Sequence, residues 1–229
     1  MKCVAIILAR GGSKGIKNKN LINVNNKPLI GWTIENALKC KELSGIFVSS
    51  DSKKILECAK SFGCETIKRP SEISSDTSTS ETGWLHALNH LKNKLNILPE
   101  LILAPQVTSP IRKKDDFSKA INSFIDNKYD SLLSVNIMRD FFIWEKKGNN
   151  FSSINYDFRN RPRRQIIKEK YHENGSFYLF KPEILTKHNN RLGGKIGIYV
   201  MDNLQHFQID EPDDIKTCEY ILRFYNEFE

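Results

Sequence analysis

The chain has 229 residues, and its 35 lysines and arginines exceed its 27 aspartates and glutamates to give a formal net charge of +8. Hydrophobic residues make up 39% of the chain and no apolar run approaches the ~20 residues that a membrane-spanning helix needs, so we expect a globular protein without a membrane partner. The five cysteines are scattered and form no Cys-x-x-Cys pair, which argues against a disulfide framework or a zinc site and favours a cytoplasmic location. The basic excess indicates an anionic partner, such as nucleic acid, a membrane surface or a phosphorylated or carboxylated small molecule, and the charge alone does not choose among them.

The first two thirds of the chain alternate strand-like and helix-like segments. Residues 3–9 form a continuous apolar run, which is typical of a strand buried on both faces, and no small-residue cleavage site of a signal peptide follows it. Strands alternating with helices predict an α/β fold, with a mostly parallel sheet covered by helices on both faces. The further elements expected in this part are helices at 28–42, 53–62, 84–95 and 115–125 and strands at 46–50, 101–104 and 131–135.

The alternation of strands and helices ends after about residue 140, where short strand candidates are separated by polar loops. Such a stretch predicts an antiparallel β-arm at about 140–180, of a kind often used for dimer contacts, inserted into a single domain that spans residues 1–229. A final helix is expected at 212–224. The strand candidates are residues 141–146, 151–156, 176–180, 196–200 and 206–209.

The first expected strand runs directly into a basic, glycine-rich segment at 10–15, Arg-Gly-Gly-Ser-Lys-Gly. In parallel α/β sheets, ligands bind just beyond the carboxyl ends of the strands. The glycines let the backbone approach an anion closely and offer N–H groups to it, and Arg10, Lys14 and Lys19 would neutralise a polyphosphate. The spacing matches neither G-x-G-x-x-G nor G-x-x-x-x-G-K-[ST], so it supports neither a dinucleotide fold nor a P-loop. A flexible basic turn is the alternative interpretation.

Two further groups of residues point to chemistry. Arg163 and Arg164 stand in an Arg-Pro-Arg-Arg-Gln run, and guanidinium groups pair bidentately with a carboxylate or a phosphate; a basic surface loop is the alternative. Asp210 follows the last expected strand and is a candidate magnesium ligand, since Mg²⁺ takes one or two carboxylates together with phosphate oxygens and water. The three carboxylates in 211–214 are interpreted as charges at the N-terminus of the final helix.

Four segments together carry a resemblance to a known family. They are Leu-Ala-Arg-Gly-Gly-Ser-Lys-Gly at 8–15 with Asn20, Arg-Pro-Ser-Glu at 69–72 followed by Asp76 and by Ser-Thr-Ser at 78–80, Ala-Pro-Gln-Val-Thr-Ser-Pro at 104–110, and Arg-Pro-Arg-Arg-Gln at 161–165 followed by Tyr-His-Glu-Asn-Gly-Ser-Phe-Tyr at 171–178. In this order they resemble the N-acylneuraminate cytidylyltransferases, also called CMP-sialic acid synthetases. The chain departs from the family pattern at Val107, where a proline is usual, at His172, where animal members have a tyrosine, and at Gln208, which replaces the first residue of an Asp-x-Asp pair.

The resemblance implies a Rossmann-like nucleotidyltransferase fold and the transfer of CMP from CTP to the anomeric 2-hydroxyl of a nonulosonic acid, with N-acylneuraminate as the favoured acceptor. It also implies a homodimer and a cofactor Mg²⁺, or Mn²⁺, held by Asp210. The implied catalytic residues are Arg10, Lys14, Lys19, Arg163 and Arg164. The implied nucleotide contacts are Arg10, Gly12, Ser13, Asn20, Arg69, Ser78, Ser80 and Gln106, and the implied acceptor contacts are Gln106, Thr108, Ser109, Arg163, Arg164, His172, Asn174 and Tyr178.

Several alternatives stay open at this level. Legionaminic, pseudaminic and 3-deoxy-octulosonic acids share the carboxylate end that the two arginines would bind, and a nucleotidyltransferase that uses GTP or UTP is also compatible with the motifs. The segment at 69–80 is alternatively a solvent loop with a helix N-cap at Ser80. The charge of +8 and the basic run at 159–170 suggest a non-enzymatic RNA-binding module. Aromatic residues are not interleaved with that run as in RNA-stacking surfaces, so we expect small-molecule partners and no nucleic acid.

Overall fold

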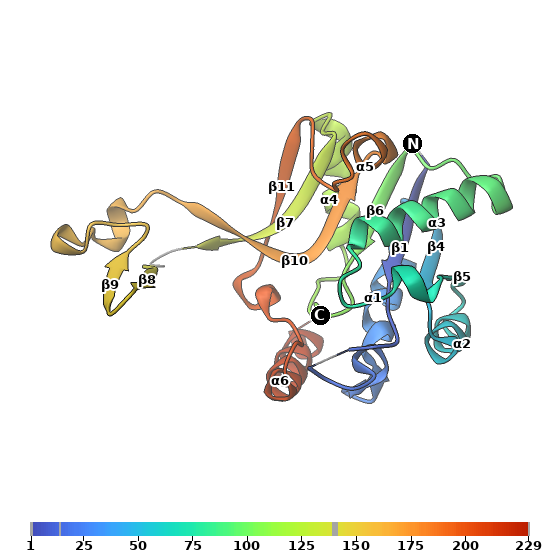
Figure 1. Ribbon diagram of the computed structural model, residues 1–229, viewed down its shortest axis with the longest axis horizontal. Helices are drawn as coiled ribbons and strands as arrows, with labels where there is room; N and C mark the ends of the chain where they lie inside the picture. The colour runs from blue at the N-terminus through green and yellow to red at the C-terminus, as the bar shows by residue number, and fades with distance from the viewer. Residues whose placement is uncertain (1, 14, 139–141, 229) are drawn as a thin grey trace.

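The computed structural model describes residues 2–13, 15–138 and 142–228, and Figure 1 shows a helix-covered sheet from which a long arm projects. The sheet has seven strands in the order β11-β7-β10-β6-β1-β4-β5. β10 is antiparallel to both of its neighbours, and the other adjacent pairs are parallel, which confirms the predicted sheet. The strands are β1 (Cys3–Leu8), β4 (Leu43–Ser50), β5 (Glu65–Lys68), β6 (Leu101–Pro105), β7 (Ser131–Met138), β10 (Lys170–Phe180) and β11 (Ile196–Met201).

Side chains alternate along β1, and this alternation attaches helices to both faces of the sheet. Ile6 packs with Trp84 of α3 (Ser80–Leu95) on one face, whereas Ile7 packs with Ile30 of α1 (Leu29–Leu38) on the other. All three isoleucines and Trp84 are at most 2% exposed, so β1 is buried on both faces, as its unbroken apolar run predicts. Within the described residues, no helix is long and apolar enough to cross a membrane. The remaining helices are α2 (Lys53–Ser61), α4 (Asp116–Asp126), α5 (Pro182–His188) and α6 (Pro212–Phe228).

The arm follows β7 in the chain and returns to the sheet as β10 (Figure 1). Its hairpin pairs β8 (Trp144–Lys147) with β9 (Asn150–Ser153), and two 3₁₀ turns follow, η3 (Phe158–Asn160) and η4 (Arg164–Ile166). Aromatic rings form a cluster inside the arm: the ring centroids of Phe142 and Tyr156 lie 4.3 Å apart, and those of Trp144 and Phe158 lie 5.5 Å apart. The arm therefore carries its own aromatic cluster, away from the cores of the body.

Two sequence expectations differ from the structure. Residues 170–180, placed at the end of the predicted arm, form β10 inside the sheet, because the apolar run that ends at Phe180 is buried between β6 and β7. The predicted strand at 206–209 is wrong. Asn203–His206 forms the 3₁₀ turn η5, which a capping box between Asp202 and Gln205 closes, and residues 207–209 form no regular element. Part of the predicted strand at 141–146 lies outside the described residues.

Candidate active site

A pocket of about 500 Å³ opens just beyond the carboxyl ends of β1 and β6. Its walls come from the loop after β1, from η1 (Lys19–Leu21), from the 69–80 loop that holds η2 (Ser71–Ile73), and from the turn after β6. Parallel α/β sheets bind their ligands at this edge, so we take the pocket as the candidate active site. Of the predicted site residues, the lining contains Arg10, Ser13, Lys19, Asn20, Arg69, Ser78, Ser80, Gln106, Thr108 and Asp210.

Two predicted phosphate-binding cations contact carboxylates at the pocket. Arg10 Nη1 lies 2.5 Å from Asp76 Oδ1, and Lys19 Nζ lies 2.8 Å from Asp210 Oδ1. Phosphate oxygens make charge-assisted hydrogen bonds of the same kind as carboxylate oxygens. Each cation is therefore held at the pocket by an anionic group that an incoming phosphate can replace.

The loop after β1 passes very close to the segment before α6. A Cβ atom added to Gly15 would lie 2.6 Å from the carbonyl oxygen of Asp210, so only glycine allows this approach. Asn20 stabilises the start of the loop, because its Nδ2 donates a hydrogen bond to the carbonyl oxygen of Arg10 at 2.9 Å. Gly12 belongs to the same loop but is not part of the pocket lining, and Lys14 lies outside the described residues.

Arg69 forms a second wall of the pocket and is almost completely buried. Its Nε donates a hydrogen bond to Ser74 Oγ at 2.9 Å, which folds the loop around the guanidinium group. Burial lowers the pKa of Arg69 below its ordinary value. The helix that follows is capped by Thr79, whose Oγ1 accepts the N–H of Thr82 at 3.3 Å. The expected cap at Ser80 is wrong by one residue, and Ser80 lines the pocket.

The turn after β6 connects the pocket to β10 and to the segment before α6. The Gln106 N–H donates to the carbonyl oxygen of Ser176 in β10 at 2.9 Å. The carbonyl oxygen of Thr108 accepts the N–H of Ile209 at 2.8 Å, which places the following residue, Asp210, at the pocket. Gln106 and Thr108 thus both line the pocket, from a turn with backbone hydrogen bonds on both sides.

Three predicted acceptor contacts are buried and lie outside the pocket lining. Asn174 is completely buried, and its Oδ1 accepts a hydrogen bond from Ser134 Oγ at 2.6 Å. Tyr178 donates its hydroxyl to Glu173 Oε1 at 2.5 Å, and burial raises its pKa. Ser109 is also buried. These side chains have internal hydrogen-bond partners and shape the strand behind the pocket.

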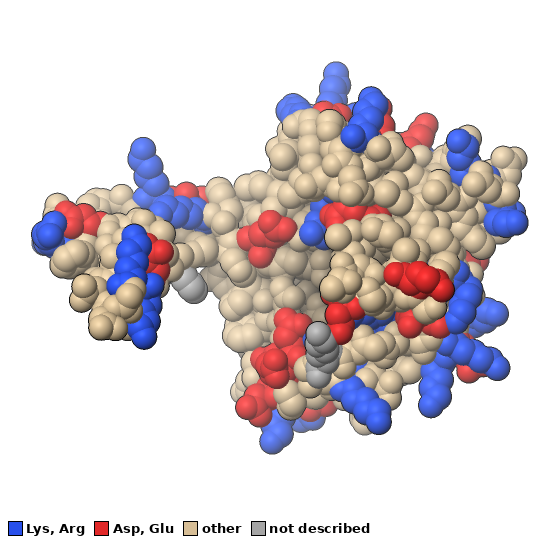
Figure 2. Space-filling model, in the orientation of Figure 1, with Lys and Arg blue, Asp and Glu red and all other residues tan. Residues whose placement is uncertain are grey.

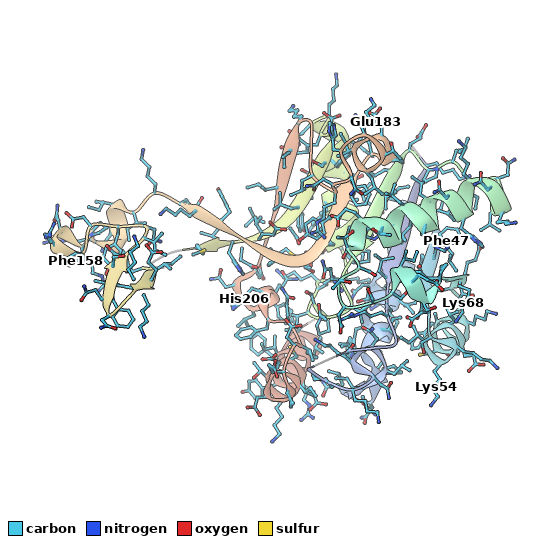
Figure 3. The ribbon with its side chains drawn as sticks, viewed as in Figure 1. Phe47, Lys54, Lys68, Phe158, Glu183 and His206 are labelled. Atoms are coloured by element: carbon cyan, nitrogen blue, oxygen red, sulfur yellow. The ribbon has the colours of Figure 1, made fainter. Side chains whose placement is uncertain are left out.

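The other predicted acceptor contacts lie on the arm or beside it. Arg163 is exposed between η3 and η4, and His172 is exposed near the start of β10, where the arm returns. Figure 3 shows Phe158 of η3 far out on the arm, on the opposite side of the molecule from Lys68, the last residue of β5. The Arg164 side chain lies outside the part of the chain that can be described.

Sequence reasoning assigned no role to Asp76 or Trp84, which also line the pocket. It took Glu211, another lining residue, only as a charge at the end of a helix. Asp76 lies inside a quoted segment, but its pairing with Arg10 joins residues 66 positions apart, which no local pattern reveals. Trp84 occupies a helical apolar position, so its sequence context indicates only a core residue. Its indole Nε1 is buried and has no hydrogen-bond partner in the described structure.

The carboxylates at the pocket fit a magnesium ion. Asp210 and Glu211 both line the pocket, and their backbone N–H groups are held by Asp214 Oδ2 at 2.9 and 2.7 Å. Gln208 is turned to β10, where its Nε2 donates to the carbonyl oxygen of Asn174 at 2.6 Å. The described residues contain no group of three or more His, Cys, Asp or Glu side chains arranged to hold a metal. Two carboxylates suit Mg²⁺ that takes its other ligands from phosphate and water.

A family match agrees with this site. Residues 4–227 match the family model described as cytidylyltransferase, so the chain belongs to the cytidylyltransferase family and is a nucleotidyltransferase. The match covers the pocket, the sheet and the arm.

Two curated relatives and one solved structure show which cytidylyltransferases this chain is similar to. The chain is 28% identical over 233 residues to a pseudaminic acid cytidylyltransferase of Campylobacter jejuni, covering 99% of both chains. It is 34% identical over 225 residues to an N-acylneuraminate cytidylyltransferase of Oncorhynchus mykiss, covering 96% of this chain and 50% of that protein. The chain therefore spans about half the length of this second relative. A solved CMP-2-keto-3-deoxy-manno-octonic acid synthetase complexed with CTP matches with a TM-score of 0.72 at 14% identity, over 98% of this chain and 100% of that one, which supports the nucleotidyltransferase fold.

Proposed function

We propose that this protein transfers CMP from CTP to the anomeric 2-hydroxyl of a nonulosonic acid and releases pyrophosphate, with N-acylneuraminate as the favoured acceptor. The observation that carries the proposal is the pocket beyond β1, which Arg10, Lys19, Arg69 and Asp210 line together. The lining combines three cations with three carboxylates, Asp76, Asp210 and Glu211, which suits a triphosphate that brings a divalent ion. The names of the relatives from O. mykiss and C. jejuni describe cytidylyl transfer to acids of this class.

In the proposed reaction, the acceptor hydroxyl oxygen forms a bond to the α-phosphorus of CTP. The bond from that phosphorus to the bridging oxygen of pyrophosphate breaks, and the hydroxyl proton is lost to water. Negative charge grows on the phosphate oxygens during this step, and Arg10 and Lys19 stabilise it after exchanging their carboxylate partners for phosphate. Arg69 and Gln106 hold the nucleotide in the orientation that this displacement needs.

We assign the cofactor role to Mg²⁺, or Mn²⁺, held by Asp210 with Glu211 beside it. When bound, such an ion lowers the pKa of a coordinated hydroxyl and neutralises phosphate charge. Asp210 suits this task because its side chain is 63% exposed, so water and phosphate can reach it. When Lys19 turns to phosphate, the Asp210 carboxylate is released for the ion.

The identity of the acceptor separates the alternatives. Pseudaminate is supported by the relative that matches over 99% of both chains, and N-acylneuraminate by relatives with higher identity, such as the 34% of the O. mykiss protein. Legionaminate and 3-deoxy-octulosonate share the same carboxylate end. We place N-acylneuraminate first because the Glu-Asn-Gly-Ser-Phe-Tyr segment at 173–178 resembles the sialic acid enzymes.

We propose further that the protein works as a homodimer joined through the arm. Large apolar side chains are exposed there, with Phe151 67% and Ile166 72% exposed, and such residues are typical of a surface that a partner covers. Arg163 lies on the same arm, away from the pocket of its own chain. In a dimer, the arm of one subunit can bring Arg163 to the pocket of its partner, where it binds the acceptor carboxylate.

The proposal includes neither nucleic acid nor a membrane as a partner. Figure 2 shows basic side chains dispersed over the body and the arm and mixed with acidic ones on this face, whereas nucleic-acid binding favours a continuous basic stripe. The five cysteines are all free thiols, which suits the reducing cytoplasm.

The experiment that tests the proposal measures pyrophosphate release with Mg²⁺ and each of CTP, UTP, GTP and ATP, in the presence and absence of N-acetylneuraminate. We expect release only with CTP and only when the acid is present. Release that requires a different nonulosonic acid would replace the acceptor and keep the reaction. Folded protein that is inactive with every nucleotide and acid, and that binds RNA in a salt-dependent way, would overturn the proposal.

A further inference from the structure

Arg112 lies behind the pocket as a buried cation, in the turn that follows β6. The residue is 7% exposed, and burial lowers the pKa of its guanidinium to about 9. Nε donates to Ser176 Oγ at 2.9 Å and Nη1 to Thr33 Oγ1 at 3.1 Å. Nη2 donates to two carbonyl oxygens, those of Gln106 and Ser176, at 2.7 Å each. Every one of these acceptors is a neutral oxygen atom.

Such a group is costly to bury. Removing a guanidinium from water is strongly unfavourable, and hydrogen bonds to neutral oxygens recover only part of that cost. Asp116 favours the charged form from a distance, without a hydrogen bond between the two side chains among those the structure describes. An apolar side chain of similar size would fill this position at lower cost, so packing alone does not explain an arginine here.

The contacts of Arg112 converge on one pocket residue. The carbonyl oxygen of Gln106 accepts from Arg112 directly, and the N–H of Gln106 donates at 2.9 Å to the Ser176 carbonyl, which Arg112 also holds. One guanidinium group thus fixes the peptide groups on both sides of Gln106. The side chain of Gln106 lines the pocket, while Arg112 itself does not.

We propose that Arg112 is a positioning residue of the transferase site, which acts by holding the backbone of Gln106 so that its amide meets the bound substrates. This inference rests on the proposed cytidylyl transfer. Lysine cannot replace arginine in this role, because its compact ammonium group cannot span two carbonyls and two hydroxyls from one place. The position therefore requires the forked shape of a guanidinium group, and positive charge alone is not enough.

A double-mutant cycle between Arg112→Lys and Gln106→Ala tests the proposal. We expect each single variant to lower kcat/KM about 10- to 100-fold at a temperature where both are folded. If Arg112 acts through Gln106, the double variant loses no more than Gln106→Ala alone, within about 3-fold. Losses that multiply in the double variant would overturn the proposal, since they would show that Arg112 supports the fold independently of Gln106.

A milder variant keeps the test decisive if Arg112→Lys does not fold. Thr33→Val removes one anchor of the guanidinium group and touches neither Gln106 nor Ser176. We expect a several-fold loss of kcat/KM that disappears in the Gln106→Ala background. Ile121→Val is the matched control, because Ile121 is a residue of α4 that is buried in the core, and the change should lower Tm without changing kcat/KM. Equal losses of kcat/KM in Thr33→Val and Ile121→Val, unchanged by Gln106→Ala, would refute the role of Arg112.

Calorimetric titration with CTP separates this inference from the proposed function. Nucleotide binding is measured for the same four proteins of the cycle without any acceptor. If the wild type binds CTP but turns over no acid, the proposed function fails. The double-mutant cycle is then evaluated with the Kd of CTP in place of kcat/KM. Coupling of Arg112 and Gln106 in Kd would then still support positioning, and independent losses in Kd would contradict it.

Discussion

Lys19 and Asp210 lie 191 positions apart in the sequence and meet at the rim of the pocket, with Nζ 2.8 Å from Oδ1. The Lys19 side chain is 13% exposed, whereas that of Asp210 is 63% exposed. The lysine is therefore held in place by its surroundings, while the carboxylate can leave the pair for another cation. This asymmetry suits a site in which a triphosphate replaces Asp210 as the partner of Lys19.

Replacing Lys19 tests the phosphate site. We expect Lys19→Met to lower kcat/KM for CTP by about 10²-fold, because the growing charge on the phosphates loses a preorganised cation. The control is Lys17→Met, which removes an exposed lysine of the same loop that does not line the pocket. Pyrophosphate release measures both. Equal activity of the two variants would contradict the assignment of Lys19.

Replacing Asp76 should strengthen nucleotide binding. Arg10 is paired with Asp76, and CTP must displace that carboxylate to reach the arginine. The two side chains are 34% and 41% exposed, so the ion pair contributes little to stability. Asp76→Asn should therefore lower the Kd of CTP, measured without divalent ions, by about 2- to 5-fold. Glu72→Gln, an exposed change in the same loop, should leave Kd unchanged. Weaker binding by Asp76→Asn would mean that the carboxylate supports the pocket and does not compete with the ligand.

Gly83 offers a test of the wall formed by Arg69. Alanine is better than glycine in a helix by about 1 kcal/mol, but a Cβ atom at position 83 would lie 2.9 Å from both Arg69 Nη1 and Leu8 Cδ1. We therefore expect Gly83→Ala to lower Tm and to weaken CTP binding by displacing Arg69. Asn89→Ala, on the exposed side of the same helix, should raise Tm slightly and leave binding intact. A stabilised Gly83→Ala protein with normal CTP affinity would contradict the close packing.

The sheet and the pocket were predictable to different degrees. Continuous apolar runs predicted β1 and β6, and the alternation of strands and helices predicted the parallel sheet, because burial on both faces leaves a clear pattern. Residues 206–209 look like a strand but were predicted wrongly, since Ile209 is buried by packing against the turn after β6 and not by strand pairing.

The sequence pointed to site residues that stand in recognisable motifs. It did not point to residues whose roles depend on contacts with distant parts of the chain. Arg10 and Gln106 follow the ends of strands, where ligands of parallel sheets bind, and both reach the pocket. Asp76 and Arg112 take their roles from partners far along the chain, and their sequence neighbours contain no sign of those contacts. For the same reason, sequence reasoning did not separate Asn174, which is buried in a hydrogen-bond network, from a residue that lines the pocket.

The pH dependence of stability can be tested at Asp130. Its Oδ1 accepts from Lys181 Nζ at 2.7 Å and its Oδ2 from the Lys195 N–H at 2.8 Å, and the lysine bond chiefly lowers the pKa of Asp130. Because the folded pKa is below the unfolded one, the stabilisation is present above about pH 4 and is lost as pH falls through the folded pKa. Asp130→Asn should cost about 1 kcal/mol at neutral pH and almost nothing in strong acid. Denaturant unfolding measures the difference, with Asp126→Asn as control; a cost independent of pH would contradict the ion pair.

The proposed dimer predicts complementation between two variants of low activity. Arg163→Ala removes the arginine of the arm, and Lys19→Met removes a cation of the pocket. A mixed dimer contains one intact pocket that faces an intact arm, so random mixing of subunits should restore about a quarter of the wild-type activity. Unfolding and refolding the two proteins together, followed by the pyrophosphate assay, measures this. Mixtures that stay inactive would mean that Arg163 does not act on the partner's pocket.

We propose that the pocket beyond β1 is where CMP is joined to a nonulosonic acid. Mass spectrometry and ³¹P NMR of a reaction with CTP, Mg²⁺ and N-acetylneuraminate test it most directly. We expect a product with a single phosphorus resonance and the mass of CMP joined to the acid, formed about 10²-fold faster by the wild type than by Lys19→Met. Pyrophosphate release without any phosphorus-containing sugar product, for N-acetylneuraminate and for the related acids alike, would contradict it.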